Sequence, residues 1–234
     1  MVTMRIAVMG ASGLIGSKLV ELLTTDGHDV VAASRNTGVD VLTGDGLADA
    51  LVGADVLVDV LNSPDFSDGP VMNFFTTSTT NLVVEAKKAG VGHYVALSIV
   101  GVDGLPDSGY LRAKVVQERI ITESGLPYTL VRATQFAEFT DQITESLLVG
   151  DEVHVPDALI QPIPADQVAA EVARAAAAAP LNDFVNIGGP QKISFEQMAR
   201  DSLARRGETK SVVVDPSAQY FGTVLDERSL VTPD

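Results

Sequence analysis

Tyr110 and Lys114 are the two residues of this 234-residue chain whose types and spacing most directly suggest chemistry. They stand four positions apart in "YLRAK", at the start of a predicted helix, so their side chains share one helix face. A nearby ammonium group favours the phenolate and so lowers the pKa of a tyrosine towards neutrality. Tyr110 is therefore predicted to donate a proton to a carbonyl oxygen, while Lys114 tunes its pKa and holds a ribose hydroxyl. The alternative is that Tyr110 only begins a helix and that Lys114 is a solvated charge.

Ser98 is a third candidate for the same chemistry. It follows the apolar run "HYVAL" at the end of a predicted strand, twelve residues before Tyr110. A serine hydroxyl at that point could donate a second hydrogen bond to the carbonyl oxygen. The predicted catalytic set is therefore Ser98, Tyr110 and Lys114.

A glycine triplet near the N-terminus suggests a nucleotide site. Gly10, Gly13 and Gly16 of "GASGLIG" stand between an apolar run and a segment with helical spacing of leucines. A strand that leads through glycines into a helix directs backbone N–H groups and a positive helix end towards a phosphate. Glycines also join strands to helices for purely steric reasons. Their place after the first predicted strand favours a dinucleotide site.

The end of the second predicted strand distinguishes NADP from NAD. A carboxylate there would hold the ribose 2′-hydroxyl of NAD, whereas an arginine would accept the 2′-phosphate of NADP. The sequence "VVAASRNTG" places Ser34 and Arg35 at this point, with no acidic residue between Val30 and Gly38. These residues predict NADP as the cofactor, although an arginine after a strand can also be a plain surface residue.

The elements that must position these residues alternate along the chain. Short apolar, β-branched runs occupy 5–9, 29–33, 55–60, 93–97, 128–132 and 184–187, and amphipathic segments occupy 14–23, 47–52, 74–88, 111–123 and 168–179. Apolar strands that alternate with helices predict a doubly wound parallel sheet, a Rossmann fold, covered on both faces. Such a sheet binds its ligand beyond the carboxyl ends of the strands.

The whole chain, 1–234, is predicted to form a single NAD(P)-binding Rossmann domain with a small substrate-side lobe from about 136–164 and 189–234. The segments 140–164 and 210 onward are expected to be irregular because glycine and proline interrupt the alternation. The apolar residues Phe136, Phe139, Leu147, Leu148, Val155 and Leu159 suggest an apolar substrate. Such aliphatic stripes are, however, more often core than pocket.

The motifs "GASGLIG", "SR", "ALS", "YLRAK" and "SGLPYTLVRATQF" together resemble the atypical short-chain dehydrogenase/reductases of the NmrA-like NAD(P)-binding branch. The resemblance implies that the 10–16 loop binds pyrophosphate, that Asp40 contacts adenine, that Asn62 and Ser63 line the loop after the fourth strand, and that 133–136 closes over the nicotinamide. The implied cofactor-binding residues are Gly10, Ser12, Gly13, Leu14, Ile15, Gly16, Ser34, Arg35, Asn36, Asp40, Val41, Leu61, Asn62, Ser63, Lys114, Ala133, Thr134, Gln135 and Phe136.

The resemblance also implies a function. Some NmrA-like members lack the tyrosine–lysine pair and act as redox sensors, whereas this chain keeps the pair. Asn81 matches a family position that is more often structural, and it is left out of the catalytic set. The expected activity is NADPH-dependent reduction of a small, apolar carbonyl or quinone, of ketoreductase type. The alternatives are an NADP(H)-sensing regulatory protein without turnover, and an NADP-retaining isomerase, epimerase or dehydratase; the chain is short for a sugar-nucleotide epimerase.

Composition excludes several other classes of protein. The formal net charge of −15 opposes nucleic-acid binding, and the three histidines are too far apart in the sequence to suggest a metal site. No apolar run is long enough for a membrane span, and the N-terminus lacks the pattern of a signal peptide. The absence of cysteine excludes disulfides and favours a reducing compartment, so a cytoplasmic location is expected.

Overall fold

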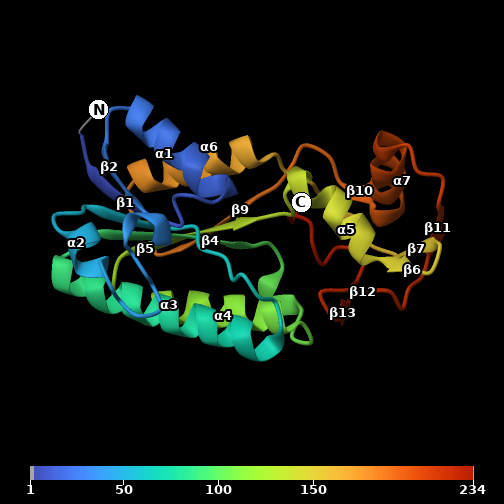
Figure 1. The fold of residues 1–234 in the computed structure, drawn as a ribbon, viewed down its shortest axis with the longest axis horizontal. Coiled ribbons are helices and arrows are strands. Elements are labelled where there is room, and N and C mark those ends of the chain that lie inside the picture. The colour runs from blue at the N-terminus through green and yellow to red at the C-terminus, as the bar shows by residue number, and fades with distance from the viewer. Residues whose placement is uncertain (1–2, 234) are drawn as a thin grey trace.

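A six-stranded parallel sheet forms the centre of the molecule (Figure 1). The computed structural model describes residues 3–233. The strand order is β2-β1-β3-β4-β5-β9, with bounds β1 (Arg5–Met9), β2 (Asp29–Ala33), β3 (Val56–Asp59), β4 (His93–Ile99), β5 (Tyr128–Ala133) and β9 (Asp183–Ile187). The chain reverses its winding direction between β1 and β3, so a switch point lies at their carboxyl ends. The predicted doubly wound fold is confirmed.

Helices cover both faces of this sheet. Helices α1 (Leu14–Thr25) and α6 (Ala165–Ala177) pack together on one face, and α2 (Leu47–Leu51), α3 (Asp68–Ala89) and α4 (Gly109–Thr122) cover the other (Figure 1). All five were predicted. Helix α3 begins six residues before its predicted start at 74, because Pro70 falls in the first turn, where the missing N–H costs nothing.

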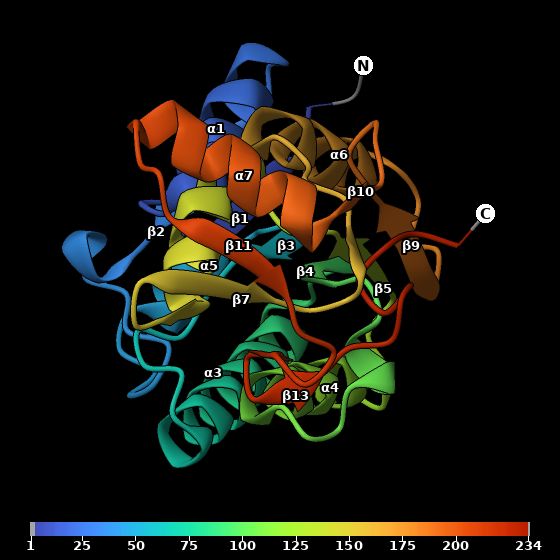
Figure 2. The same ribbon diagram turned by 90° about the vertical axis from the view of Figure 1, so that its right-hand side faces the viewer.

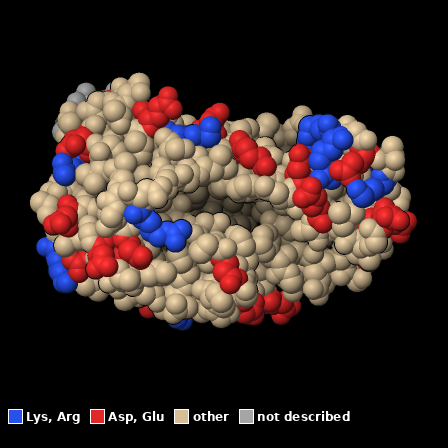
Figure 3. Space-filling view, viewed as in Figure 1, with Lys and Arg blue, Asp and Glu red and all other residues tan. Residues whose placement is uncertain are grey.

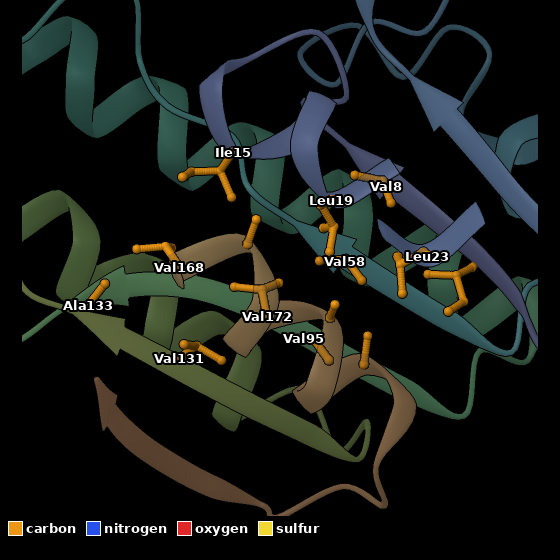
Figure 4. Close-up of a cluster of buried hydrophobic side chains, with 14 of the residues drawn as sticks. Val8, Ile15, Leu19, Leu23, Val58, Val95, Val131, Ala133, Val168 and Val172 are labelled. Atoms are coloured by element: carbon orange, nitrogen blue, oxygen red, sulfur yellow. The ribbon is translucent and has the colours of Figure 1, made fainter. Parts of the chain in front are cut away.

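The core on the α1/α6 face is aliphatic. Figure 4 shows Leu19 and Leu23 of α1 and Val168 and Val172 of α6 directed towards the sheet. They pack in one cluster with Val58, Val95 and Val131 of the strands β3, β4 and β5. Full burial of each such side chain contributes roughly 1.5–3 kcal/mol. This packing fixes α1, and with it the glycine-rich loop at its N-terminus.

A smaller lobe stands beyond the carboxyl ends of the strands (Figure 2). It contains α5 (Thr140–Ser146), β6 (Leu148–Val149), β7 (Glu152–Val155), β8 (Leu159–Ile160), β10 (Ile193–Ser194), α7 (Phe195–Arg206), β11 (Ser211–Val214) and the hairpin of β12 (Gln219–Tyr220) and β13 (Thr223–Val224). It falls within the predicted 136–164 and 189–234, of which residue 234 lies outside the described part. The lobe has its own apolar cluster, which includes Val153, Phe195 and Met198.

The prediction that 140–164 and 210 onward are irregular was wrong. Strand β7 pairs antiparallel with β6 and parallel with β11, and β8 pairs antiparallel with β10. These strands have two to four residues, too short to show an alternating pattern, and β11 comes from far along the chain. Leu147 and Val155, proposed as pocket residues, belong to the buried core of the lobe.

Within residues 3–233, no helix combines the length and the apolar character that crossing a bilayer requires. The same residues contain no cluster of three or more histidine, aspartate or glutamate side chains suited to a metal ion.

Candidate active site

The glycine-rich loop is held tightly between the ends of β2 and β3. The backbone N–H groups of Gly10 and Ala11 both donate to the carbonyl oxygen of Ala33, at 3.1 Å. Gly10 has a φ of +87°, and a Cβ at this residue would lie 3.0 Å from the carbonyl oxygen of Val60. Only glycine fits this conformation and this close approach without strain.

Gly16 allows α1 to approach the loop. A Cβ there would lie 2.1 Å from the carbonyl oxygen of Gly10, far inside a van der Waals contact. The N-cap of α1 is Gly13, which provides no side-chain cap, and the first turn contains no acidic residue. The positive end of α1 is thus left without a neutralising group of its own, which suits an anion.

Gly16→Ala is expected to abolish tight dinucleotide binding and to lower the free energy of unfolding by about 1–3 kcal/mol, because α1 must move away from the loop. Gly104→Ala is the matched control, since no described atom lies within 4 Å of the Cβ that it would add and Gly104 is not among the candidate cofactor residues. Titration of NADPH fluorescence and urea unfolding measure the two effects. Equal affinity in the two variants would show that the close approach at Gly16 does not shape the site.

Ser34 and Arg35 follow β2 directly and so lie next to this loop. The backbone N–H of Ser34 donates to Thr37 Oγ1 at 2.9 Å, which begins a short 3₁₀ turn, η1 (Arg35–Thr37). Arg35 and Asn36 are exposed, and Arg35 makes no ion pair with any residue in 3–233. In a chain of net charge −15 this unpaired cation is free to meet a phosphate.

The segment around Asp40 is ordered by its own polar groups. Asp40 Oδ1 accepts hydrogen bonds from the backbone N–H groups of Leu42 (2.8 Å) and Thr43 (3.3 Å). Asn81 Nδ2 donates to the carbonyl oxygens of Val41 (2.9 Å) and Leu42 (3.1 Å). Asn81 therefore supports this loop, in agreement with its exclusion from the catalytic set. The contacts of Asp40 and Val41 with adenine stay predictions.

Asn62 and Ser63 follow β3, the third strand along the chain, and their assignment to the fourth strand was wrong. Asn62 Oδ1 accepts hydrogen bonds from the backbone N–H of Ser63 at 3.0 Å and from the Tyr110 hydroxyl at 3.2 Å. Ser63 is buried and donates through Oγ to the carbonyl oxygen of Asp65. This loop, which begins at Leu61, thus joins the candidate cofactor residues to the candidate proton donor.

Tyr110 lies in the first turn of α4, as predicted. Ser108 caps this helix, its Oγ accepting from the backbone N–H of Leu111 at 3.3 Å. The Tyr110 ring is enclosed by other aromatic rings, with centroid distances of 5.1 Å to Phe66 and 5.2 Å to Phe221. Burial raises the pKa of Tyr110 above its usual value, against a smaller opposite effect of its bond to Asn62.

The predicted lowering of the Tyr110 pKa by Lys114 is therefore wrong for this structure. Lys114 Nζ donates to the carbonyl oxygen of Leu97 at 2.9 Å and to Gln117 Oε1, and lies 4.6 Å from the centre of the Phe75 ring. Sharing a helix face did not bring the ammonium to the Tyr110 hydroxyl. Lys114 is 3% exposed, so it is not a solvated charge either. Burial lowers its pKa to about 8, while Asp59 and Glu118 act in the opposite direction.

Ser98 directly follows Leu97, the residue whose carbonyl oxygen accepts a hydrogen bond from Lys114 Nζ. Ser98 is buried near the end of β4, and its Oγ has no hydrogen-bond partner within the described part of the chain. A buried hydroxyl without a partner is costly, and a ligand oxygen would remove that cost.

Residues 133–136 extend from the end of β5, the neighbour of β4. Thr134 Oγ1 donates to the carbonyl oxygen of Gln161, and Phe136 stacks on Phe139 with centroids 5.7 Å apart. Gln135 Oε1 is buried and unpartnered among residues 3–233. Ala133 ends β5 within the aliphatic core. Closure of this segment over a nicotinamide stays a prediction.

Figure 3 shows a hollow near the centre of the face seen in Figure 1, between the sheet with its helices and the smaller lobe. Some charged side chains stand around its rim, with basic ones at the left edge in this view, while its visible wall is largely uncharged. The hollow lies beyond the carboxyl ends of the strands, where a doubly wound sheet binds its ligand.

A family model described as NAD(P)H-binding matches residues 10–179, which include the glycine-rich loop, Arg35, Ser98, Tyr110 and Lys114. The chain belongs to the NAD(P)H-binding family. The resemblance to atypical, NmrA-like short-chain dehydrogenase/reductases found in the sequence is confirmed, and with it an NAD(P)-binding Rossmann fold. The uncapped N-terminus of α1, the cradle of Gly10 and Gly16, and the unpaired Arg35 fit such a dinucleotide.

The proteins similar to this NAD(P)H-binding chain carry names that describe different roles, among them an assembly factor and an oxidoreductase. The photosystem II assembly factor Ycf39 of Cyanophora paradoxa is 26% identical over 147 residues, 57% of this chain and 46% of that protein. The chain thus spans about half the length of this relative. Among solved structures, MoeE5 in complex with UDP-glucose and NAD has a TM-score of 0.74 at 20% identity, over 93% of this chain and 86% of MoeE5.

The NADPH-dependent quinone oxidoreductase QOR2 of Escherichia coli, in complex with NADPH, has a TM-score of 0.65 at 20% identity, over 90% of this chain and 77% of QOR2. At these identities the solved structures show that the NAD(P)H-binding chain shares their fold.

Three polar residues of this site, Asp59, Tyr94 and Gln117, were missed by the sequence analysis. Asp59 is the last residue of β3 and is 1% exposed, although it carries a carboxylate. An acidic residue inside an apolar run, as in "VLVDVL", was a signal that could have marked it. Gln117 follows Lys114 by three residues, a spacing that puts the two side chains on one helix face.

Proposed function

We propose that the protein is an NADPH-dependent oxidoreductase that reduces a small, apolar carbonyl or quinone. The observation that carries this proposal is the link from Tyr110 through its hydrogen bond to Asn62 into the loop at the switch point of the sheet, with Ser98 and Lys114 at the end of the neighbouring strand β4. A proton donor is thus fixed on the side of the sheet where the dinucleotide would be held.

The chemistry needs one hydride and one proton. When bound, the reduced nicotinamide supplies the hydride to the substrate carbon. Tyr110, whose pKa is raised by burial, stays protonated at neutral pH and gives its hydroxyl proton to the oxygen that becomes negative. Ser98 Oγ donates a hydrogen bond to the same oxygen, and the Lys114 ammonium stabilises the negative charge from the end of β4. A carbonyl becomes an alcohol. A quinone becomes a hydroquinone once the product loses the proton at the reduced carbon and gains one at its second oxygen.

The apolar substrate class follows from the surroundings of Tyr110. Phe66 and Phe221, both about 40% exposed, border its ring from two different segments. Aromatic faces favour a flat, apolar molecule over a heavily hydroxylated one. The similarity in fold to a quinone oxidoreductase supports the same class.

Arg35→Ala is expected to weaken NADPH binding by about 10–100-fold, because a charge-assisted pair with the 2′-phosphate is lost, while NADH binding changes little. Lys87→Ala is the control, since Lys87 at the end of α3 also lacks an ion pair within residues 3–233. Fluorescence titration with both nucleotides measures the ratio of affinities. An unchanged NADPH/NADH ratio in Arg35→Ala would reject the assignment of NADP.

The activity itself is tested by following NADPH absorbance with a panel of quinones, ketones and aldehydes, while cofactor fluorescence confirms binding in the same samples. Consumption of NADPH with formation of the reduced product supports the oxidoreductase. Conversion of a substrate without net consumption of NADPH would instead indicate an isomerase or epimerase.

A second candidate is an NADP(H)-sensing protein that regulates the assembly of a partner complex. The similarity to a photosystem II assembly factor favours it. Two features of the site also favour it: other aromatic rings cover the Tyr110 ring, and the Lys114 ammonium bonds to Leu97 and not to the Tyr110 hydroxyl. A sensor must bind NADPH and NADP⁺ with different free energies. Equal affinities for the two, measured by calorimetry, would count against this function.

A further inference from the structure

The ammonium of Lys114 is held by a line of buried polar groups that the proposed reaction does not itself use. Its Nζ donates to the carbonyl oxygen of Leu97 in β4 and to Gln117 Oε1 one turn further along α4. Gln117 is 1% exposed, so its amide is removed from water and must find all its partners inside the protein.

The other end of the Gln117 amide meets a carboxylate. Gln117 Nε2 donates to Asp59 Oδ2 at 2.9 Å. An ammonium group can only donate hydrogen bonds and an ionised carboxylate can only accept them, so the amide has a single orientation that satisfies both. The line Asp59–Gln117–Lys114 is therefore directional, from the end of β3 to the end of β4.

Asp59 is itself fixed from two further sides. Its Oδ2 also accepts from the Tyr94 hydroxyl at 3.0 Å, and its Oδ1 accepts from the backbone N–H of Leu61 at 3.1 Å. Leu61 precedes Asn62, the residue that binds the Tyr110 hydroxyl. Asp59 therefore supports both the lysine and the loop that holds the proposed proton donor.

The buried charges of Asp59 and Lys114 each stabilise the ionised form of the other. Burial alone disfavours the ionised form of each group, and it raises the pKa of Asp59 and lowers that of Lys114. Each charge opposes the effect of burial on the other. Glu118 also favours the charged lysine, but its carboxylate is occupied by Arg132. Asp59 is thus the acidic partner to which the amide connects Lys114.

We propose that Gln117 and Asp59 are positioning residues, which hold the Lys114 ammonium charged and in place at the carboxyl end of β4, beside Ser98. The importance of this position for catalysis rests on the proposed function. The hydrogen-bonded line itself does not, so it can be tested separately.

The test uses the 234-residue chain, which contains six lysines, labelled with ¹³C-lysine. The Cε signal of Lys114 is assigned by its loss in Lys114→Met, and its pH titration is followed by NMR. In the wild type the midpoint is expected at about 8. In Asp59→Asn and in Gln117→Met it is expected to fall by about one pH unit or more, a tenfold loss of proton affinity, because the opposite charge or the acceptor is removed.

Asp55→Asn is the matched control. Asp55 directly precedes β3, and its carboxylate binds the exposed backbone N–H of Arg5, so its loss should leave the Lys114 midpoint unchanged. If Asp59→Asn does not fold, as judged by circular dichroism, Gln117→Met carries the test, since methionine fills a similar volume without hydrogen bonding. A Lys114 midpoint equal to that of the wild type in the folded variant would overturn the proposal.

The pH dependence of NADPH oxidation separates this proposal from the proposed function. If the protein is a reductase, the fall of its rate at alkaline pH should move with the Lys114 midpoint in the same variants. A wild type that oxidises no NADPH with any substrate would reject the reductase, while the NMR midpoints would still decide the role of Asp59 and Gln117.

Discussion

Replacing Tyr110 with phenylalanine is expected to lower the rate of NADPH-dependent reduction by a factor of about 10²–10⁴, the usual loss when a general acid is removed. The raised pKa of Tyr110 keeps its hydroxyl protonated, so this residue has a proton to give throughout the neutral range. The variant keeps the ring, and with it the contacts to Phe66 and Phe221. The expected loss is therefore in kcat, with little change in stability or in NADPH affinity.

Tyr128→Phe provides the control for this experiment. Tyr128 begins β5, at the end of the strand remote from the site, so removing its hydroxyl should leave turnover unchanged. Steady-state kinetics with the best substrate of the panel gives kcat for both variants. Full activity in Tyr110→Phe would reject Tyr110 as the proton donor. A wild type that turns over no substrate of the panel would instead make the sensor the stronger candidate.

Replacing Arg132 with methionine is expected to lower the free energy of unfolding by about 3–5 kcal/mol, the typical cost of leaving one member of a buried ion pair without its partner. Arg132 of β5 donates from Nε and Nη2 to the two carboxylate oxygens of Glu118 on α4, at 2.9 and 2.6 Å. Their side chains are only 10% and 9% exposed. The variant would also lose the contact of the guanidinium with the Phe184 ring, 4.1 Å away.

Urea unfolding measures this loss, with two companion variants. The double variant Arg132→Met/Glu118→Met should recover much of the stability, because no charge is then left buried without a partner. Arg119→Met, an exposed arginine on the same helix α4, should change stability by less than about 0.5 kcal/mol. A loss in Arg132→Met no greater than in Arg119→Met would show that the buried pair contributes little.

The main sheet and the glycine-rich loop could be predicted from the sequence because their signals are local. A strand buried on both faces, such as β1 from Ile6 to Met9, is a continuous apolar run, and Gly10 and Gly16 stand where a side chain would collide with the backbone. The smaller lobe could not be predicted in the same way. Its strands take their pairing from residues far along the chain, as β7 does from β11.

The candidate site shows the same limit at the level of side chains. The spacing of Tyr110 and Lys114 correctly placed both at the start of a helix, but it could not show where the lysine side chain ends. The lysine ammonium bonds to Gln117, and the Gln117 amide bonds to Asp59, which is 58 residues away from Gln117 in the sequence. The pKa of Tyr110 depends likewise on rings such as Phe221, from a distant hairpin.

The pairing of β7 with β11 has a consequence for synthesis of the chain on the ribosome. Residues 152–155 are made about sixty residues before their partners at 211–214, and the apolar residues of α5 and β7 have no cover until α7 has also emerged. Contacts between such distant segments form slowly. The sheet requires nothing beyond β9 and can be complete before the lobe closes. The half-made lobe is thus the stage at which this protein would most need a chaperone.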